Sequence, residues 1–405
     1  MAINKEQNKL NVPHLRFPEF HGEWEEHGLS EYLDFKNGLN PDSKRFGKGI
    51  KFISVMDILN NPVITYDCIR ASVQATDAEI SSFSVENGDI LFQRSSETLE
   101  DVGRANVYID DKVAVFGGFV IRGKKKANYN PLFFRYLLSS PYARKRIIPM
   151  GAGAQHFNIG QEGLSKVLLN FPSIEEQTKI ASLLHLLDER IATQSKLIED
   201  LKKLKSAIID YAINSLDTDF AKFGSLYEMA GEGGTPTTSN ASFYDNGKIP
   251  FVKIDDLKKK YLTENKDFIT ELGLQKSSAW LVPTRSILFS NGATIGEITI
   301  TTYPVCTKQG ILGIVPKPNI DVEFLYYFMS SSYFKKAVSR IVTEGTMKTV
   351  YLKDINNIRC PIPKKEKQLD IAKMPSALNF KIDFEQSILK LFGSQKQYLL
   401  RQMFM

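Results

Sequence analysis

The most regular pattern of apolar positions lies in the middle of the chain. Across residues 174–216 apolar side chains recur at spacings of three and four, and neither glycine nor proline interrupts them. This spacing predicts an amphipathic helix with a single apolar stripe. Such a helix would be roughly 60 Å long at 1.5 Å per residue, and its stripe has to be buried against a partner.

The last part of the chain carries a similar but less regular stripe between Ile371 and Leu400. We predict that the two helices pack as an antiparallel coiled coil; the alternative is that each packs only on its own globular domain. Pro375 lies early in the second stripe, where a helix-interior proline costs roughly 3 kcal/mol, and Gly393 is a weak point of about 1 kcal/mol. The second helix should therefore be kinked there or, the favoured alternative, begin near Ser376.

Outside these stripes the chain shows short runs of β-forming residues bounded by Gly, Pro, Asn and Asp. In the first half the runs at residues 49–55, 89–92, 105–109 and 113–121 predict strands. Residues 131–146 predict a helix, with a counterpart at 322–338. Each globular part is therefore expected to be α+β.

The two halves of the chain repeat one another in the same order of blocks. The FISVMDI segment at Phe52 matches FVKIDDL at Phe251, and YLLSSPYARKRI at Tyr136 matches YFMSSSYFKKAV at Tyr327. Two glycine loops also match, and they are GAGAQ from Gly151 to Gln155 and GTMKT from Gly345 to Thr349. A repeated order of this kind indicates a duplicated module.

These patterns predict two pseudo-symmetric α+β domains separated by two long helices packed as an antiparallel coiled coil. The expected boundaries are 1–172 and 217–362 for the domains, 173–216 for the central helical region and 363–405 for the C-terminal one.

Composition narrows the class of protein without identifying it. The 405 residues carry a formal net charge of +6, and basic residues gather in local clusters that could neutralise phosphates. No stretch has the length of a membrane helix, and the first twenty residues lack the apolar core of a signal peptide, so a cytoplasmic protein is expected. Cys68, Cys306 and Cys360 have no paired spacing and are expected to be reduced thiols.

Catalytic signatures are missing from the sequence. It contains no Walker A run, HExxH, GxSxG or Asp-Pro-Pro-Tyr-like tetrapeptide of adenine methyltransferases. The five histidines have no ligand spacing. We therefore expect no catalytic residue, no metal site and no cofactor in this chain.

Several stretches resemble the specificity subunits of type I restriction-modification systems over essentially the whole chain. They are LRFPEF from Leu15 to Phe20 with Trp24, GDILF from Gly88 to Phe92, ILFSNGATIGE from Ile287 to Glu297, and VCTKQGILGIVPK from Val305 to Lys317. The resemblance implies two target recognition domains, each binding one half of a split sequence in double-stranded DNA. It also implies a subunit that itself cuts and methylates nothing.

The family's partners are implied in the same way. Two modification subunits would use S-adenosylmethionine to methylate adenine, and restriction subunits would use ATP and Mg²⁺. The paired helices would then act as a ruler that holds the two DNA-reading domains about one DNA turn apart.

Residues in loops with side chains suited to base edges or phosphates are the candidate DNA contacts. In the first domain they are Lys44, Arg45, Arg94, Ser95, Arg104, Gln155, His156 and Asn158. In the second domain they are Thr237, Thr238, Ser239, Asn240, Lys253, Asn291, Thr294, Lys308, Gln309 and Lys348. Any one of them could contact only a phosphate or nothing.

Two other functions stay open at this point. The chain could be a coiled-coil scaffold whose duplicated domains bind protein, which DNA binding without salt sensitivity or no DNA binding would favour. It could also be a nuclease or methyltransferase with an unrecognised site, which activity of the purified chain alone would favour.

Overall fold

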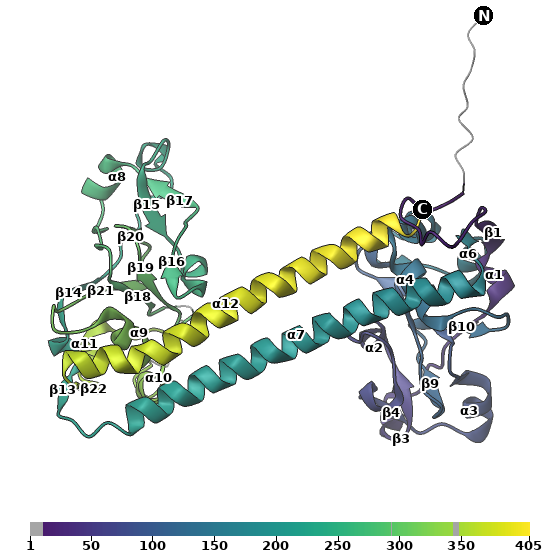
Figure 1. Cartoon of the computed structure of the whole chain (residues 1–405), viewed down its shortest axis with the longest axis horizontal. Helices are drawn as coiled ribbons and strands as arrows, with labels where there is room; N and C mark the ends of the chain where they lie inside the picture. Colours follow the sequence, from purple (N-terminus) through teal and green to yellow (C-terminus); the bar gives the residue numbers. More distant parts are fainter. Residues whose placement is uncertain (1–10, 293, 343–347) are drawn as a thin grey trace, which may run out of the picture. The chain divides into compact units, whose positions relative to one another are not determined.

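The computed structural model describes residues 11–292, 294–342 and 348–405. Contacts between backbone positions divide the chain into two units, shown with their elements in Figure 1. Unit 1 comprises Met1–Ser195 with Ile388–Met405, and unit 2 comprises Lys196–Ser387. Gly345, Thr346 and Met347 of the second glycine loop lie outside the described residues, as does Ala293 of the ILFSNGATIGE stretch.

Unit 1 is built from small sheets with helices around them. Its strands are β1 (Glu25–Gly28), β2 (Leu33–Asn37), β3 (Phe46–Ile53), β4 (Ser72–Val73), β5 (Ser84–Val85), β6 (Ile90–Gln93), β7 (Ser95–Ser96), β8 (Ala105–Val107), β9 (Ala114–Phe116), β10 (Val120–Lys125), β11 (Phe157–Asn158) and β12 (Leu168–Phe171). Its helices are α1 (Leu29–Tyr32), α2 (Val55–Asn60), α3 (Asp77–Phe83), α4 (Pro131–Ser139), α5 (Pro141–Ile147), α6 (Gln161–Ser165), the first half of α7 (Ile174–Asn214) and the end of α12 (Lys365–Gln402). One sheet has the order β2-β10-β6-β8 and another β4-β3-β9-β5.

Unit 2 repeats this plan. Its strands are β13 (Phe220–Lys222), β14 (Tyr227–Glu232), β15 (Ile249–Val252), β16 (Tyr261–Leu262), β17 (Asp267–Ile269), β18 (Ile287–Ser290), β19 (Ile298–Thr301), β20 (Cys306–Thr307), β21 (Ile311–Pro316) and β22 (Arg359–Pro361). Its shorter helices are α8 (Glu271–Gln275), α9 (Val322–Ser330), α10 (Ser332–Ser339) and α11 (Leu352–Ile355). The main sheet has the order β14-β21-β18-β19-β16, so β21 and β18 take the places of β10 and β6.

The two units share not only their strand order but also certain side-chain hydrogen bonds. The buried Gln177 donates to the carbonyl of Pro172 over 3.0 Å and accepts from the Asn130 N–H over 3.1 Å. The buried Gln368 donates to the Pro363 carbonyl over 2.9 Å and accepts from the N–H of the residue that caps α9 over 2.8 Å. The same device joins each long helix to its unit, which supports the duplication inferred from sequence.

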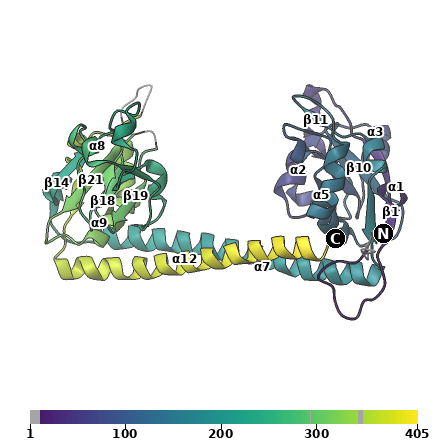
Figure 2. The same ribbon diagram turned by 90° about the horizontal axis from the view of Figure 1, so that it is seen from above.

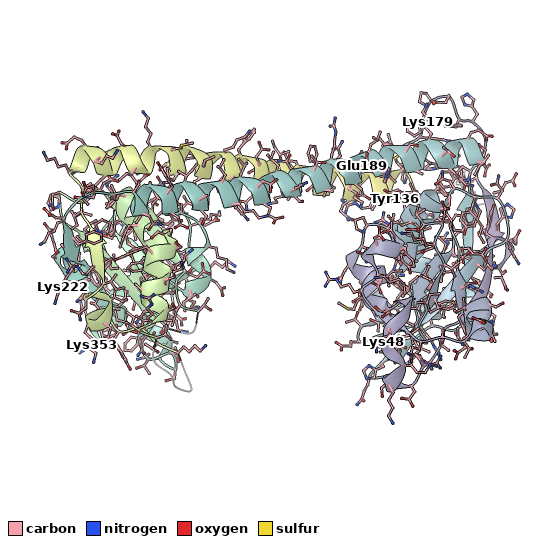
Figure 3. The ribbon with its side chains drawn as sticks, turned by 90° about the horizontal axis from the view of Figure 1, so that it is seen from below. Lys48, Tyr136, Lys179, Glu189, Lys222 and Lys353 are labelled. Carbon is pink, nitrogen blue, oxygen red and sulfur yellow. The ribbon has the colours of Figure 1, made fainter. Side chains whose placement is uncertain are left out.

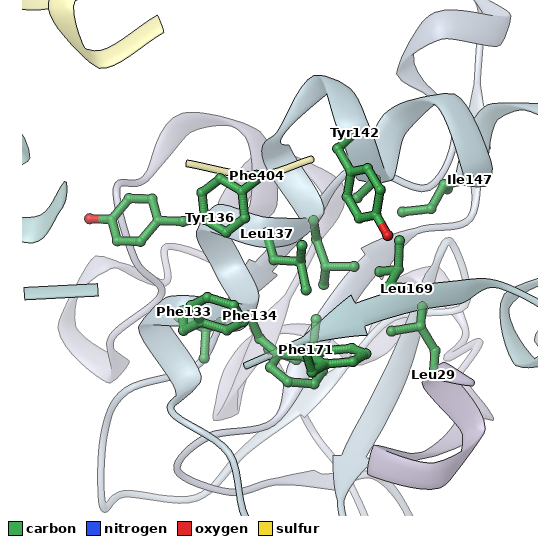
Figure 4. Packing of buried hydrophobic residues seen from close by; sticks show 14 of the residues in the cluster. Leu29, Phe133, Phe134, Tyr136, Leu137, Tyr142, Ile147, Leu169, Phe171 and Phe404 are labelled. Carbon is green, nitrogen blue, oxygen red and sulfur yellow. The ribbon is translucent and has the colours of Figure 1, made fainter. Parts of the chain in front are cut away.

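The two long helices pack against each other inside each unit. In unit 1 Ile180 and Leu184 of α7 share a core with Leu399 and Leu400 of α12. Phe404, just beyond α12, lies 5.6 Å between ring centroids from Phe133 of α4, in the cluster shown in Figure 4. The beginning of α7 thus meets the end of α12.

In unit 2 the opposite ends meet. Ile209 and Ile213 of α7 share a core with Ile371 and Ala372 of α12. The helices are therefore antiparallel, and the predicted coiled-coil pairing is confirmed. The alternative in which each helix packs only on its own domain is wrong, because each unit's core takes side chains from both helices.

A polar contact fixes the helices in unit 1. Asp188 of α7 is 14% exposed and accepts hydrogen bonds from Tyr136 Oη over 2.9 Å and Arg135 Nη1 over 3.2 Å, both on α4. It also pairs with Lys396 of α12. Figure 3 shows Tyr136 next to the long helices of unit 1.

A related contact occurs at the matching helix positions of unit 2. Lys205 Nζ of α7 donates to Asn379 Oδ1 of α12 over 2.9 Å. Counted from the two buried glutamines, Asn379 matches Asp188, and Lys205 matches Lys396. Unit 2 thus keeps the lysine and replaces the carboxylate by an amide.

Three sequence-based predictions about short elements were wrong. Residues 131–146 form two helices, because Ser140 is extended (φ −68°, ψ 150°) and its Oγ accepts from the Ala143 N–H. Pro141 also disfavours a helical conformation in the residue before it. The counterpart helix predicted at residues 322–338 breaks in the same way at Ser331 (φ −67°, ψ 155°), although no proline follows it. The single strand predicted at residues 113–121 is also wrong, because these residues form β9 and the start of β10 with a tight turn between them.

The expectation that the second helix begins near Ser376 was also wrong. Helix α12 begins at Lys365 and passes through Pro375. Its first turns are held by the buried Gln368 and by burial of Ile371 and Ala372 in the unit 2 core, and Pro375 itself is buried. This packing outweighs the hydrogen bond that the proline cannot donate.

In the part of the chain that the structure describes, no helix combines the length and apolarity of a membrane span.

We predict that Pro375→Ala stabilises the protein by about 1–3 kcal/mol, since it restores a helix donor at the cost of a small buried ring. Gly393→Ala is the reference, because a Cβ there meets no atom within 4 Å; it should add about 1 kcal/mol. Thermal unfolding of the three proteins measures both effects. A destabilised Pro375→Ala protein beside a stabilised Gly393→Ala protein would show that packing of the ring outweighs the lost hydrogen bond.

Candidate nucleic-acid interface

In unit 1 the candidate contacts gather where β6 ends. Arg94 follows β6, and its carbonyl accepts from the Ile159 N–H over 3.0 Å. Strand β7 pairs with β11 so that Ser95 lies opposite Asn158, and their side chains are hydrogen-bonded. The Asn158 amide also donates to the His156 carbonyl over 3.4 Å. The glycine loop and the Arg94 loop therefore form one surface.

The glycine loop owes its shape to Gly153. This residue adopts a φ of +145°, and a Cβ there would collide with the carbonyl of His156. Gln155 and His156 are exposed on the loop. Figure 2 shows β11 at the end of unit 1 that lies away from α7.

The remaining candidates of unit 1 differ in how free their charges are. Arg104 adjoins the loops through its carbonyl, which accepts from the Gln93 N–H over 2.7 Å, and its guanidinium is 2.6 Å from Asp101 Oδ1. Lys44 is exposed on the 3₁₀ turn Ser43–Arg45.

Arg45 is held by a carboxylate of its own unit. Its guanidinium bonds both oxygens of Glu79 and donates from Nε to the Gln74 carbonyl over 2.8 Å. The hydrogen bond from Arg45, with that from the Thr76 N–H, lowers the pKa of Glu79 from its ordinary 4.5 to about 2. Contact of Arg45 with DNA stays a prediction. In this structure the Arg45 side chain is bound to Glu79.

In unit 2 the corresponding site consists of the loop after β18 and the turn between β20 and β21. Lys308 and Gln309 are exposed on that turn, and the Gln309 N–H donates to Thr235 Oγ1 over 3.2 Å. The Asn291 N–H donates to the Gly310 carbonyl over 3.0 Å. This is the place that Arg94 holds in unit 1.

Asn291 itself is only 1% exposed, and its amide donates to the Val350 carbonyl over 3.2 Å. It therefore supports the loop in this structure. Thr294 is exposed beside it, and its carbonyl accepts from Ser290 Oγ over 2.5 Å. Lys348 is exposed on the other side of the same loop pair, next to the Gly292–Thr349 bridge.

The other candidates of unit 2 lie on neighbouring segments. Thr237, Thr238, Ser239 and Asn240 form one exposed turn that follows Thr235, and Asn240 caps the 3₁₀ turn Ala241–Phe243. Lys253 is half exposed, and its ammonium lies 2.8 Å from Asp267 Oδ1. The structure thus joins Lys308, Gln309 and Thr294 to one surface, with the Thr237 turn adjoining it through Thr235.

Phe119 is a residue of this surface that the sequence did not single out. It stands in the apolar stretch VAVFGGFVI, where an aromatic side chain is expected in the core. Its side chain is 68% exposed, although the residues on both sides of it are buried. The sequence repeat could have revealed it, because Gly117–Phe119 match Lys308–Gly310 of the second half. Lys308 and Gln309 were already candidate DNA contacts.

Metal ligands and cysteines were the remaining candidates for chemistry in the described ranges. Those residues contain no group of three or more His, Cys, Asp or Glu that could hold a metal ion. All three cysteines are free, as expected, and burial raises the pKa of the Cys306 thiol to about 11. Burial raises the pKa of the Cys360 thiol as well, so neither buried thiol is activated.

Comparison with known proteins places this arrangement in a family. The model of the type I restriction modification DNA specificity domain matches residues 21–203 and again 217–391. The HindI specificity subunit of Haemophilus influenzae is 22% identical, over 80% of this chain and 86% of that protein. The MjaVIII specificity subunit of Methanocaldococcus jannaschii is 22% identical, over 95% of this chain and 92% of that protein.

A solved structure shares the fold. The crystal structure of a type I restriction-modification S subunit from M. genitalium matches with a TM-score of 0.57 and 17% identity. The match covers 97% of this chain and 99% of that one.

We predict that the Glu79–Arg45 pair stabilises unit 1 only above acidic pH. The pKa of Glu79 is depressed in the folded state, so its contribution is complete above about pH 4.5 and is lost as the pH falls towards about 2. Unfolding of wild-type and Glu79→Gln proteins between these pH values measures the difference. The two stabilities should converge as the pH falls; a constant gap would show that the pair does not set this pKa.

Proposed function

The chain belongs to the family of type I restriction-modification specificity subunits, and on that premise we propose how its residues divide the recognition of DNA. It is a DNA-recognition component with two target recognition domains and no catalytic role of its own. The loops around Arg94 and Asn158 bind one half of a split target. The loops around Lys308 and Thr294 bind the other half.

One observation carries this proposal: the same frame occurs twice with different chemistry on its loops. The Arg94 and Asn291 N–H groups donate to equivalent carbonyls of matching turns, those of Phe119 and Gly310. The side chains exposed at these places differ between the units. Identical frames with different donors and acceptors would recognise different bases, so the target is asymmetric.

Base recognition is proposed for some residues and phosphate contact for others. Arg94 matches guanine in the major groove, and Asn158 and Gln309 match adenine. Lys44, Lys308 and Lys348 carry compact charges that suit phosphates and set the position of the backbone. We also propose that the protein acts in the cytoplasm.

The outer surface of the long helices is proposed to bind the modification subunits. Tyr211 of α7 and Phe380, Phe384 and Leu391 of α12 are at least 59% exposed although they are large and apolar. Apolar side chains at successive turns of a helix suit a helical partner surface. The modification subunits, with S-adenosylmethionine, would then methylate the adenine that the loops select, and restriction subunits would use ATP and Mg²⁺.

The two sets of loops should be separable by mutation. Arg94→Ala should weaken discrimination in one half-site and Gln309→Ala in the other, each by about tenfold. Binding of the complex with modification subunits to duplexes altered in one half measures this. Lys112→Ala, which removes an exposed charge just before β9 and away from the long helices, is the control and should leave both halves unchanged.

Loss of discrimination in both halves from either variant would contradict the division. Binding of DNA by the wild-type complex that is insensitive to salt, or absent, would instead favour a protein-binding scaffold.

The helix length should set the gap between the half-sites. Seven residues inserted into α7 between Lys196 and Lys205, with seven at the matching place in α12 between Ser387 and Lys396, preserve the apolar stripes and add about 10 Å. The gap should lengthen by about three base pairs at 3.4 Å each. The same seven residues added after Met405 should change nothing.

The target of each variant is found by mapping N6-methyladenine in cells that also make the modification subunit. An unchanged gap in the lengthened protein would refute the ruler hypothesis.

A further inference from the structure

The turn between β9 and β10 presents one side chain to solvent. Gly117, Gly118, Phe119 and Val120 form it, and the Val120 N–H donates to the Gly117 carbonyl over 2.8 Å. A Cβ on Gly117 would lie 2.6 Å from Phe52 Cζ, and one on Gly118 would collide with the Asn40 side chain. Phe119 is therefore the only side chain that this turn can carry outward.

The turn is fixed to the loop that holds the candidate DNA contacts. The Arg94 N–H donates to the Phe119 carbonyl over 2.9 Å, and Arg94 Nη1 donates to the Gly118 carbonyl over 3.3 Å. The Gly117 N–H is bound to the Ile53 carbonyl over 3.0 Å. The backbone of Phe119 is thus fixed before any ligand arrives, beside a guanidinium for which one hydrogen bond is described.

Unit 2 shows what the same turn carries in the other copy. In that turn the Lys308 N–H donates to the Val252 carbonyl over 2.9 Å, and the Gly310 carbonyl accepts from the Asn291 N–H. Residue for residue, Gly117, Gly118 and Phe119 correspond to Lys308, Gln309 and Gly310. One copy presents two polar side chains, and the other presents a single aromatic ring.

A single exposed apolar side chain needs no explanation on its own. Here the backbone that carries the ring is fixed by hydrogen bonds, the turn adjoins Arg94, and the matching turn is polar in the other unit. The apolar group that base edges offer in the major groove is the 5-methyl group of thymine. A half-site that contains a methylatable adenine also contains the thymine paired with it.

We propose that Phe119 contacts a thymine methyl group in the half-site bound by unit 1 and so helps to determine its sequence. This inference rests on the proposed function of the same loops. It assigns the aromatic ring a part in direct base recognition, next to the hydrogen bonds of Arg94.

The test couples the side chain to the methyl group. The complex with modification subunits is titrated against its target duplex and against duplexes in which each thymine of that half-site in turn is replaced by deoxyuridine, which removes only the methyl group. For the wild-type protein one replacement should weaken binding about fourfold, the equivalent of about 0.8 kcal/mol for one buried methyl-sized group. Phe119→Ala should bind the unmodified target about tenfold less tightly and be insensitive to that replacement.

Two controls separate this result from general damage. Val113, 45% exposed at the other end of β9, gives Val113→Ala, which should keep the wild-type response. Phe119→Leu should keep part of the sensitivity, because it remains apolar. Both Phe119 variants should melt at the wild-type temperature, since the ring is exposed.

The outcomes are distinguishable. Wild-type affinity of Phe119→Ala for the target, or a loss that is not coupled to any thymine, overturns the proposed contact. A wild-type complex that does not prefer the target over a scrambled duplex defeats the proposed function itself, whatever the variants do.

Discussion

The structure depends on burying one apolar stripe on each of two long helices, which a single helix cannot do alone. Each unit solves this by enclosing the beginning of one helix and the end of the other within its own core. Asp188 then fixes the position of α12 on α7 in unit 1, because it joins Lys396 to the two α4 residues Arg135 and Tyr136. A half-buried carboxylate with three partners tolerates little displacement, since moving it would break hydrogen bonds to both helices at once. The Lys205–Asn379 contact is its weaker counterpart in unit 2.

The two copies of the module keep the same framework contacts and differ in the side chains of their loops. The contacts made by Gln177 and Gln368, and the parallel pairs β3–β9 and β15–β20, recur because both copies need the same frame. The loops that follow β6 and β18 share their backbone hydrogen bonds with that frame, whereas their side-chain bonds differ: Arg94 donates to Gly118 in one copy and Asn291 to Val350 in the other. Their side chains can therefore change without loss of the fold, and a duplicated module of this kind can bind two unlike half-sites. This would be the physical basis of the asymmetric target that we propose.

Sequence patterns predicted the features that depend on periodicity and repetition, and they failed where local packing decides. The end-to-end course of α7 and the pairing of the helices followed from the spacing of apolar residues. The breaks at Ser140 and Ser331 could not be predicted that way, because a serine cap competes with helix continuation through a single hydrogen bond. The passage of α12 through Pro375 depends on burial that no local signal reports, and the pairing of Arg45 with Glu79 requires knowledge of the fold. Phe119 was missed because an aromatic residue among apolar neighbours is usually buried.

The central claim is that this chain selects a split DNA sequence for modification by other subunits. Single-molecule sequencing of N6-methyladenine tests it most directly, in cells without a system of their own that make this chain together with its modification subunit. We expect one new asymmetric, two-part motif with a methylated adenine on each strand, which is absent when this chain is omitted. No new methylation despite a stable complex of the two proteins, or the same methylation without this chain, would contradict it.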